Sequence, residues 1–281
     1  MAVLRNEALG KKITRYTILG ILAFLFLLPF YVVVRNAFAT DDIITSDVWV
    51  LWPIPMHILD NFRSIFQDSR ISILSGIRVS VIVATLQTTL HLLFASMAGY
   101  ALARIPFKYR QVVFTFVVST MMIPNYVTFI PTYMIVKQLG LVNTLPGIIL
   151  PAVFWTFSAF MYRQFFLDFP VEIEEQGILD GMGYFDIWAR LVMPNALGVT
   201  VSLGIIDFFR AWRAFLWPLV VARDEGLWTI QVVLSQYLTS QNVVLYHIFL
   251  GAFIALFPMV VLFFIFQRFI MEGVAMSGVK G

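Results

Sequence analysis

Six apolar stretches, each long enough to cross a bilayer, constrain the fold of this chain more than any other feature. They are Thr14–Val34, Val79–Ala103, Val112–Val136, Leu145–Phe166, Ala196–Val221 and Val243–Phe269. A membrane-spanning helix needs about 20 mostly apolar residues, and lipid offers no hydrogen-bond partners to a backbone that is not helical. Only 12% of the 281 residues are charged, against about a quarter in soluble domains. The sequence therefore predicts an all-α membrane protein with six transmembrane helices in one domain, residues 1–281.

The positive charges beside these stretches indicate the orientation, because lysine and arginine gather on the cytoplasmic side of membrane proteins. The flanks on the side of the N-terminus carry Lys11, Lys12, Arg15, Arg104, Lys108, Arg110, Arg163, Arg190, Arg268 and Lys280. Longer connections on the other side carry Arg35, Arg63, Arg70, Lys137 and Arg223. We therefore expect both termini in the cytoplasm and the first stretch to be a retained signal anchor.

Residues 35–76 form the longest connection, which this orientation places outside the cell. Trp49 and Trp52 suit a position at the membrane interface. The loop fits two interpretations, a contact for an external partner or a packed connection without one.

The connection 168–195 is acidic and carries glycines, so locally it fits either an ordinary surface loop or two short helices with a hinge. Its defining residues are Glu172, Glu174, Glu175, Gly181, Gly183 and Pro194. Carboxylates suit the start of a helix, where the dipole is positive, and the glycines interrupt that helix. A second helix over Tyr184–Val192 would place Phe185, Trp188 and Val192 on one face, with the proline limiting its extension.

Polar residues inside the apolar stretches are candidates for a solute pathway, because intramembrane charges usually face the protein interior and pair. Asp207 and Arg210 are three residues apart and can pair on one helix face, with Arg213 near that face. These charges predict either a polar lining for a hydrophilic solute or an ion pair that only fixes helix packing. Asn125 follows Pro124 in the third stretch, where a bent helix is expected to border a pathway.

Other site chemistries are poorly supported by the sequence. The chain has no cysteine, which excludes disulfides, thiolate metal sites and thiol catalysis. Its three histidines lack metal-ligand spacing, and we interpret His91 in the second stretch as a hydrogen bonder between helices. No run of basic residues suggests a nucleic-acid surface.

The acidic connection resembles the EAA loop of bacterial ABC-importer permeases, whose pattern is Glu-Ala-Ala, Asp-Gly-Ala, an aromatic residue, then an aliphatic residue before Pro. The matching residues are Glu175-Gln176-Gly177, Asp180-Gly181-Met182, Trp188, Leu191 and Pro194. Gln176, Gly177 and Met182 depart from the usual small alanines. In that family the two short helices are coupling helices that sit in a cleft of a cytoplasmic ATPase subunit.

Further segments resemble the carbohydrate-type branch of this family, whose second maltose-permease subunit is similar along the chain. They are GYALAR at 99–104, MMIP at 121–124, LGL at 139–141, YRQFF at 162–166 and the tail 273–281. That tail resembles a cytoplasmic C-terminus that reaches the ATPase interface. The fifth stretch carries Arg213-Ala214 after Trp212, where the branch usually has a neutral and an acidic residue. This difference predicts an anionic or acidic sugar as the solute.

The resemblance implies a permease subunit of an ABC importer for a carbohydrate or related polar solute in the bacterial inner membrane. The expected partners are a second permease, two ATPase subunits and an external solute-binding protein. No phosphate-binding Gly-rich Lys-Ser/Thr loop is present, so ATP and magnesium are expected on the ATPases, and this chain is expected to bind no cofactor or metal and not to be an enzyme. The resemblance implies ATPase coupling through Glu174, Glu175, Gly177, Asp180, Gly181, Phe185, Trp188, Leu191 and Pro194. The alternative is a stand-alone proton-coupled transporter with Asp207 and His247 as a relay.

Overall fold

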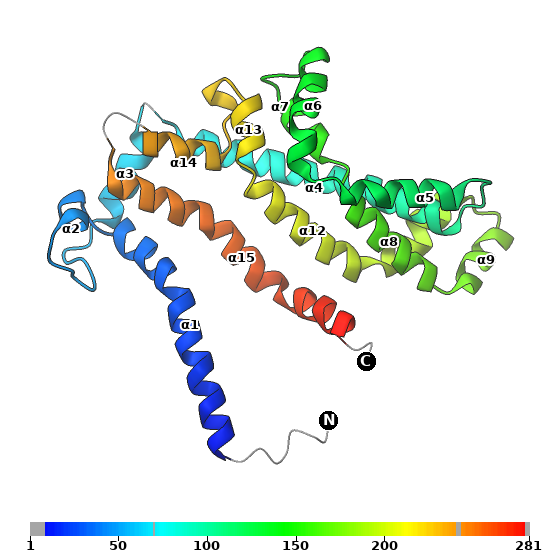
Figure 1. Ribbon diagram of the computed structural model, residues 1–281, viewed down its shortest axis with the longest axis horizontal. Helices are drawn as coiled ribbons and strands as arrows, with labels where there is room; N and C mark the ends of the chain where they lie inside the picture. Colours follow the sequence, from blue (N-terminus) through cyan, green and yellow to red (C-terminus); the bar gives the residue numbers. More distant parts are fainter. Residues whose placement is uncertain (1–8, 70, 240–242, 279–281) are drawn as a thin grey trace. The chain divides into compact units, whose positions relative to one another are not determined.

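The computed structural model describes residues 9–69, 71–239 and 243–278, and these residues form helices joined by turns and loops (Figure 1). The chain divides into two compact units. Unit 1 contains the described parts of Met1–Ile71 and Leu234–Phe257, and unit 2 those of Ser72–Val233 and Pro258–Gly281.

Unit 1 combines an exposed apolar helix, suited to contact with lipid, with the folded connection 35–76. It contains α1 (Leu9–Ala37), α2 (Asp41–Thr45), α3 (Ile58–Gln67), the end of α14 (Ile230–Thr239) and the first part of α15 (Leu245–Gly278). The most apolar window of α1 is not buried at all by the protein, as expected of a helix that faces lipid. Its last turn differs, because Arg35 is buried and its Nε donates to the carbonyl of Val50 at 3.1 Å. The predicted loop 35–76 is therefore folded, with two helices of its own.

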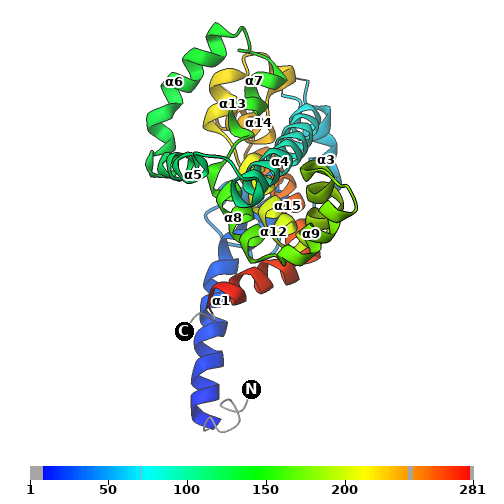
Figure 2. The same cartoon turned by 90° about the vertical axis from the view of Figure 1, so that its right-hand side faces the viewer.

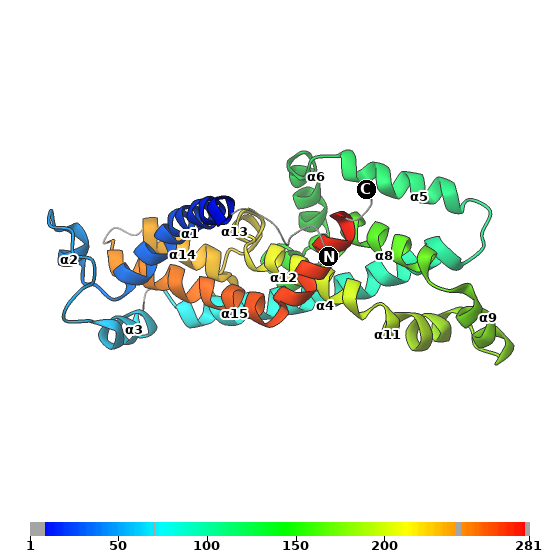
Figure 3. The ribbon, with the colours of Figure 1, turned by 90° about the horizontal axis from the view of Figure 1, so that it is seen from below.

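Unit 2 is built around α4 (Ile73–Arg104), which packs along α8 (Thr156–Asp168) and α12 (Leu197–Trp212), as Figure 3 shows. Its other elements are α5 (Arg110–Ser119), η2 (Thr120–Met122), α6 (Asn125–Gln138), α7 (Leu145–Ile149), η3 (Leu150–Ala152), α9 (Val171–Leu179), α10 (Tyr184–Asp186), η4 (Ile187–Val192), α11 (Met193–Asn195), α13 (Leu216–Val221), η5 (Glu225–Leu227) and the start of α14. The last part of α15 also belongs to it. This helix continues through residues 273–278 of the predicted tail, and residues 279–281 lie outside the described residues.

The close packing of α4 on α8 depends on Gly99. A Cβ atom added there would lie 2.6 Å from Cβ of Tyr162, 2.9 Å from the backbone N of Arg163 and 3.0 Å from the carbonyl oxygen of Ala159. Two of these atoms belong to backbone, so a side chain at this position would force the helices apart. Tyr162 and Phe166 of α8 are fully buried in the core formed here, which makes α4 and α8 a rigid pair.

Three of the six predicted stretches form single helices that could span a membrane, and three do not. Gly10–Ala37, Ile73–Arg104 and Leu245–Gln267 pass by length and composition. The third stretch is broken into Arg110–Met122 and Asn125–Gln138, bent by 104°, and Figure 2 shows the sharp angle between α5 and α6. The fourth is broken into Leu145–Ala152 and Thr156–Asp168, bent by 46°. Counting each bent pair as one span gives up to six spans.

The prediction of one continuous fifth helix over Ala196–Val221 is wrong. The α12 helix ends at Trp212 and α13 begins at Leu216, and the pair that meets the span criterion is instead Tyr184–Asn195 with Leu197–Trp212, bent by 82°. Proline explains the interruption, because its ring clashes with the carbonyl four residues earlier and it has no N–H to donate. Pro218 instead lies in the first turn of α13, where its missing N–H costs little.

Candidate coupling site

Residues 168–195 fold as two helical segments joined by a tight turn, and we call them the acidic hairpin. The first segment is α9, and the second runs through α10, η4 and α11. The turn contains Gly181 at φ +82°, a backbone conformation that favours glycine. The N–H groups of Gly181 and Met182 donate to the carbonyls of Ile178 and Gly177 at 3.0 and 2.9 Å, which closes the end of α9. The predicted glycine hinge is thus an ordered turn.

The second segment of the acidic hairpin contains a π-helical stretch, Ile187–Val192, which changes the face predicted from regular helical spacing. The N–H of Met193 donates to the carbonyl of Trp188, five residues back. Trp188 and Val192 are buried, whereas Phe185 is 64% exposed with its ring 5.3 Å from that of Trp188. Phe185 therefore lies next to Trp188, as its spacing predicts, but it does not share the burial of Trp188 and Val192. Pro194 does not end the helical segment but lies in the first turn of α11.

The inner face of the acidic hairpin is fixed to α4 by polar contacts. Glu174 is 7% exposed, and its Oε1 lies 2.8 Å from Nε of Arg104. Its Oε2 accepts a hydrogen bond from the Tyr100 hydroxyl at 3.0 Å. Arg104 also donates through Nη2 to the carbonyl of Phe169, which precedes α9. The carboxylate at Glu174 therefore holds the hairpin within this chain.

The inner face also packs on the second segment through Gly177. A Cβ atom there would lie 2.8 Å from Cδ1 of Leu191 and 3.3 Å from Cγ1 of Ile187. Glycine thus brings α9 closer to η4 than a larger residue would. Leu191 and Trp188 pack in the same cluster as Tyr100 and Phe169, so they brace the second segment from inside.

The outer face combines carboxylates with exposed apolar side chains. Glu175 and Asp180 are exposed, and Leu179 and Phe185 are 86% and 64% exposed. The predicted coupling residues therefore divide into an inner set that fixes the hairpin and an outer set that is open to a partner.

Asp207 and Arg210 form the ion pair that their spacing predicts. Asp207 is fully buried, and its Oδ1 accepts from Nε of Arg210 at 2.8 Å and from Nη2 at 2.5 Å. Arg210 also donates to the carbonyl of Ala152 at 2.9 Å and lies over the Trp155 ring at 5.1 Å. The pair therefore ties α12 to the break between η3 and α8. This geometry confirms the pairing and adds a packing role to it.

The other polar residues of the predicted stretches have surroundings that differ from those of the Asp207–Arg210 pair. Arg213 is exposed at the end of α12, and its Nε donates to the carbonyl of Phe209 at 3.2 Å. Asn125 is exposed at the first turn of α6. His91 is buried with Nδ1 2.6 Å from the carbonyl oxygen of Val153, which confirms it as a hydrogen bonder between segments.

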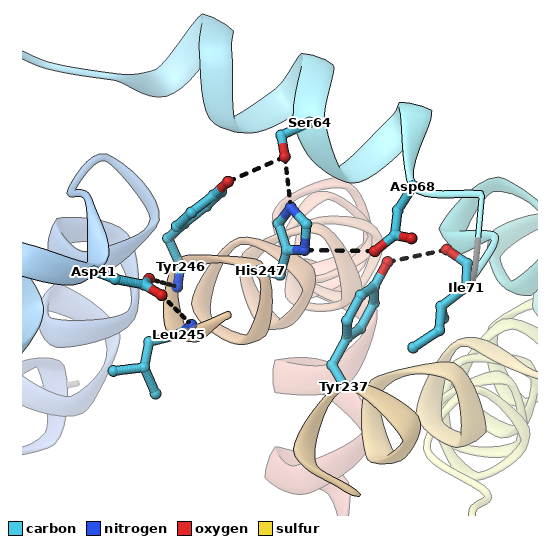
Figure 4. A network of polar contacts seen from close by, with 8 residues as sticks. All are labelled: Asp41, Ser64, Asp68, Ile71, Tyr237, Leu245, Tyr246 and His247. Atoms are coloured by element: carbon cyan, nitrogen blue, oxygen red, sulfur yellow. Dashed lines mark hydrogen bonds and ion pairs between the residues drawn. The ribbon is translucent and has the colours of Figure 1, made fainter. Parts of the chain in front are cut away.

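Unit 1 contains a second polar network, which fastens the connection 35–76 to the start of α15 (Figure 4). The Asp41 carboxylate accepts from the N–H groups of Leu245 and Tyr246 at 3.2 and 3.0 Å. Ser64 of α3 lies 2.9 Å from Nε2 of His247 and 3.0 Å from the Tyr246 hydroxyl. A carboxylate at a helix N-terminus and a bridged histidine both fix the helix end.

Comparison with known proteins assigns this architecture to a family. The family described as binding-protein-dependent transport system inner membrane component matches residues 91–275. The chain belongs to this family. It is therefore a membrane transport component and not an enzyme.

The similar proteins match this chain over almost its whole length. The arabinooligosaccharides transport system permease protein AraQ of Halalkalibacterium halodurans is 30% identical over 92% of this chain and 93% of its own. The lactose transport system permease protein LacG of Rhizobium radiobacter is 29% identical over 93% and 94%. A chain from the crystal structure of a bacterial ABC transporter involved in the import of the acidic polysaccharide alginate has a TM-score of 0.83 at 18% identity, over 94% and 98% of the two chains. The resemblance to ABC permeases is confirmed.

Several contact residues of the transport component were missed by sequence reasoning. Tyr100 lies in the second predicted stretch, 74 positions before Glu174, and Arg104 directly follows that stretch, where it served only as an orientation charge. Asp41 lies 204 positions before Leu245. No local pattern connects residues at such separations. The available clue to the contact with Glu174 was that Arg104, at the end of the second stretch, lies on the same predicted side of the membrane as the glutamates of the connection 168–195.

Proposed function

We propose that the chain is one of two permease subunits of an ATP-driven ABC importer for a carbohydrate or related polar solute. The observation that carries this proposal is the acidic hairpin, which is fixed to α4 on its inner face and presents carboxylates and apolar side chains on its outer face. A segment with this construction is suited to receive motion from a partner and pass it to the membrane helices. The permeases of similar sequence, named for arabinooligosaccharides and lactose, support the solute class.

The proposed partners are a second permease, two ATPase subunits and an external solute-binding protein. Glu175, Asp180 and Phe185 of the outer face would meet the ATPase, and the ordered turn at Gly181 would keep their arrangement. ATP and magnesium would bind to the ATPases, and this chain would bind no cofactor. Closure of the ATPases would then switch the spans between inward- and outward-facing packings.

The proposed topology has six spans, with both termini and the acidic hairpin in the cytoplasm and the connection 35–76 outside. It counts each of the three bent helix pairs as one span, and the distribution of basic residues supports its direction. The chain lacks cysteine, so single cysteines report topology directly. Leu179→Cys should react only with reagents on the cytoplasmic side, and Leu59→Cys only on the external side. The reverse pattern would contradict this orientation.

An acidic carbohydrate is a second candidate within the same solute class. Arg213 supports it, because its cation is exposed where α12 ends and a polar pathway could meet it. The alginate importer of similar fold transports an acidic polysaccharide. A guanidinium is well suited to bind carboxylates in two-pronged geometry.

The experiment that tests the proposal is mild purification of the tagged chain from its own membranes. The expected result is a second permease and an ATPase with a phosphate-binding loop in the same complex. Recovery of the chain alone would contradict the proposal and favour a stand-alone proton-coupled carrier. In that alternative the relay would join Asp207 and His247, whereas Asp207 is paired with Arg210 and His247 lies against Ser64 and Asp68.

A further inference from the structure

Glu174 differs from the other glutamates of the acidic hairpin, although it belongs to the same short helix. Glu172 and Glu175 are exposed, whereas the Glu174 side chain is 9% exposed and that of its partner Arg104 is 14% exposed. A buried carboxylate persists only where charge and hydrogen bonds compensate for lost water. The Arg104 guanidinium and the Tyr100 hydroxyl supply that compensation.

Both partners of Glu174 come from the last turn of α4. Tyr100 and Arg104 are four residues apart, so they share one face of the helix. The two oxygens of Glu174 are divided between them, with Oε1 at 2.8 Å from Nε of Arg104 and Oε2 at 3.0 Å from the Tyr100 hydroxyl. This two-point contact fixes the orientation of the side chain as well as its position.

Arg104 holds the acidic hairpin at a second place. Its Nη2 donates to the carbonyl of Phe169, the residue that follows the end of α8 and precedes α9. One guanidinium therefore connects the end of α4, the end of α8 and the middle of α9. Since α4 packs along both α8 and α12, a displacement of α9 is communicated to the core of unit 2.

We infer that Glu174 is a positioning residue that locks the acidic hairpin to α4, so that the two move as one body when a partner moves α9. The inference rests on the proposed function, because it concerns the transmission of ATPase motion. It assigns to Glu174 a role different from that of Glu175. Glu174 is already paired and buried in its own chain, so it is not free to pair with a partner, whereas Glu175 is exposed.

The inference can be tested by distance measurement, without knowing the solute. In the purified complex, with other cysteines removed, spin labels are attached at Val171→Cys on α9 and Leu86→Cys on α4. Both positions are exposed, at 46% and 48%, and neither belongs to the outer face proposed to meet the ATPase. The distance between the labels is measured without nucleotide and with ATP and vanadate. A rigid connection predicts the same narrow distance distribution in both states.

Three substitutions in the labelled protein separate the charge lock from general packing. Glu174→Gln keeps the shape but removes the charge, and its distance distribution should shift or broaden when ATP and vanadate are added. Tyr100→Phe removes only one hydrogen bond and should give a smaller change in the same direction. Glu172→Gln is the matched control, an exposed glutamate of the same helix, and should behave like the parent. The ATPase should remain bound to all of them.

Two results would overturn the inference. One is a change of distance between nucleotide states in the parent, which would mean that the hairpin moves independently of α4. The other is a Glu174→Gln protein, stable to the same temperature as Glu172→Gln, whose distances match the parent in both states. Failure of the proposed function looks different, since no ATPase would then be bound and nucleotide would have no effect on any variant.

Discussion

The packing of Gly177 against the second segment of the acidic hairpin predicts different outcomes for substitution by alanine and by valine. In Gly177→Ala, the new Cβ would lie 2.8 Å from Cδ1 of Leu191 and 3.4 Å from Sδ of Met182. Both atoms belong to side chains, which can rotate at a cost of about 0.5–1.5 kcal/mol. Alanine in a helix interior regains about 1 kcal/mol relative to glycine. These effects nearly cancel, so we expect Gly177→Ala to be close to neutral.

Gly177→Val adds two further carbons to the same space. Overpacking of this kind costs about 1–3 kcal/mol, and the helix propensity of valine offsets only a fraction of it. The expected net loss of about 1–2 kcal/mol corresponds to a roughly 5- to 30-fold larger population of the locally opened hairpin.

Amide hydrogen exchange of the protein in lipid nanodiscs measures this opening. Peptides that cover α9 and η4 should exchange roughly 5- to 30-fold faster in Gly177→Val and at the parental rate in Gly177→Ala. Gly183→Ser is the control, because Gly183 has open space around it and occupies an N-cap position, where serine is favoured. Parental exchange in Gly177→Val would refute the conclusion that this close approach fixes the hairpin.

Four further substitutions test separate parts of the account. In Gly181→Asp, the new Cβ would meet no atom within 4 Å, but the residue must adopt φ +82°, a backbone strain that costs about 1–2 kcal/mol. The variant should insert into the membrane normally and lose ATP-coupled uptake. Normal uptake would show that the hairpin has no part in the mechanism. Arg210→Gln leaves the fully buried Asp207 without its cation. Breaking a buried ion pair costs about 3–5 kcal/mol, and the cost is less here because Arg210 is 36% exposed. The melting temperature should therefore fall in Arg210→Gln and recover when Asp207→Asn is added. Asp41→Asn should cost about 1 kcal/mol, seen as faster amide exchange in the first turn of α15; an unchanged rate would refute the capping role. Arg213→Asn should lower uptake of oligogalacturonides but not of neutral arabinotriose, and equal uptake of both would exclude the acidic-sugar proposal.

Features encoded by neighbouring residues could be predicted from the sequence. The apolar stretches follow from composition, and the pair of Asp207 with Arg210 follows from a spacing of three on one helix. The glycine at the hairpin turn is also a local requirement, because φ +82° at Gly181 favours that residue. The landmarks of the coupling motif belong to the same class.

Features that depend on distant residues could not be predicted in this way. The contact between Glu174 and α4 joins segments separated by two predicted membrane stretches, and its existence depends on how α8 packs on α4. The π-helical stretch Ile187–Val192, which ends with a hydrogen bond from the N–H of Met193 to the carbonyl of Trp188, is not anticipated by a regular helical period. Pro218 gave a local indication of the break before α13, since a proline in a helix interior removes a backbone hydrogen bond, but the long apolar run concealed it.

The central claim is that this chain converts the action of partner ATPases into passage of a solute. It is tested most directly by solute uptake into proteoliposomes that contain the purified complex, loaded with ATP or without it. Radiolabelled arabinooligosaccharides and lactose are suitable first probes, because permeases of similar sequence are named for them. The expected result is uptake that requires internal ATP, the ATPase subunits and the binding protein. Uptake by this chain alone, driven by a proton gradient without ATP, would contradict it.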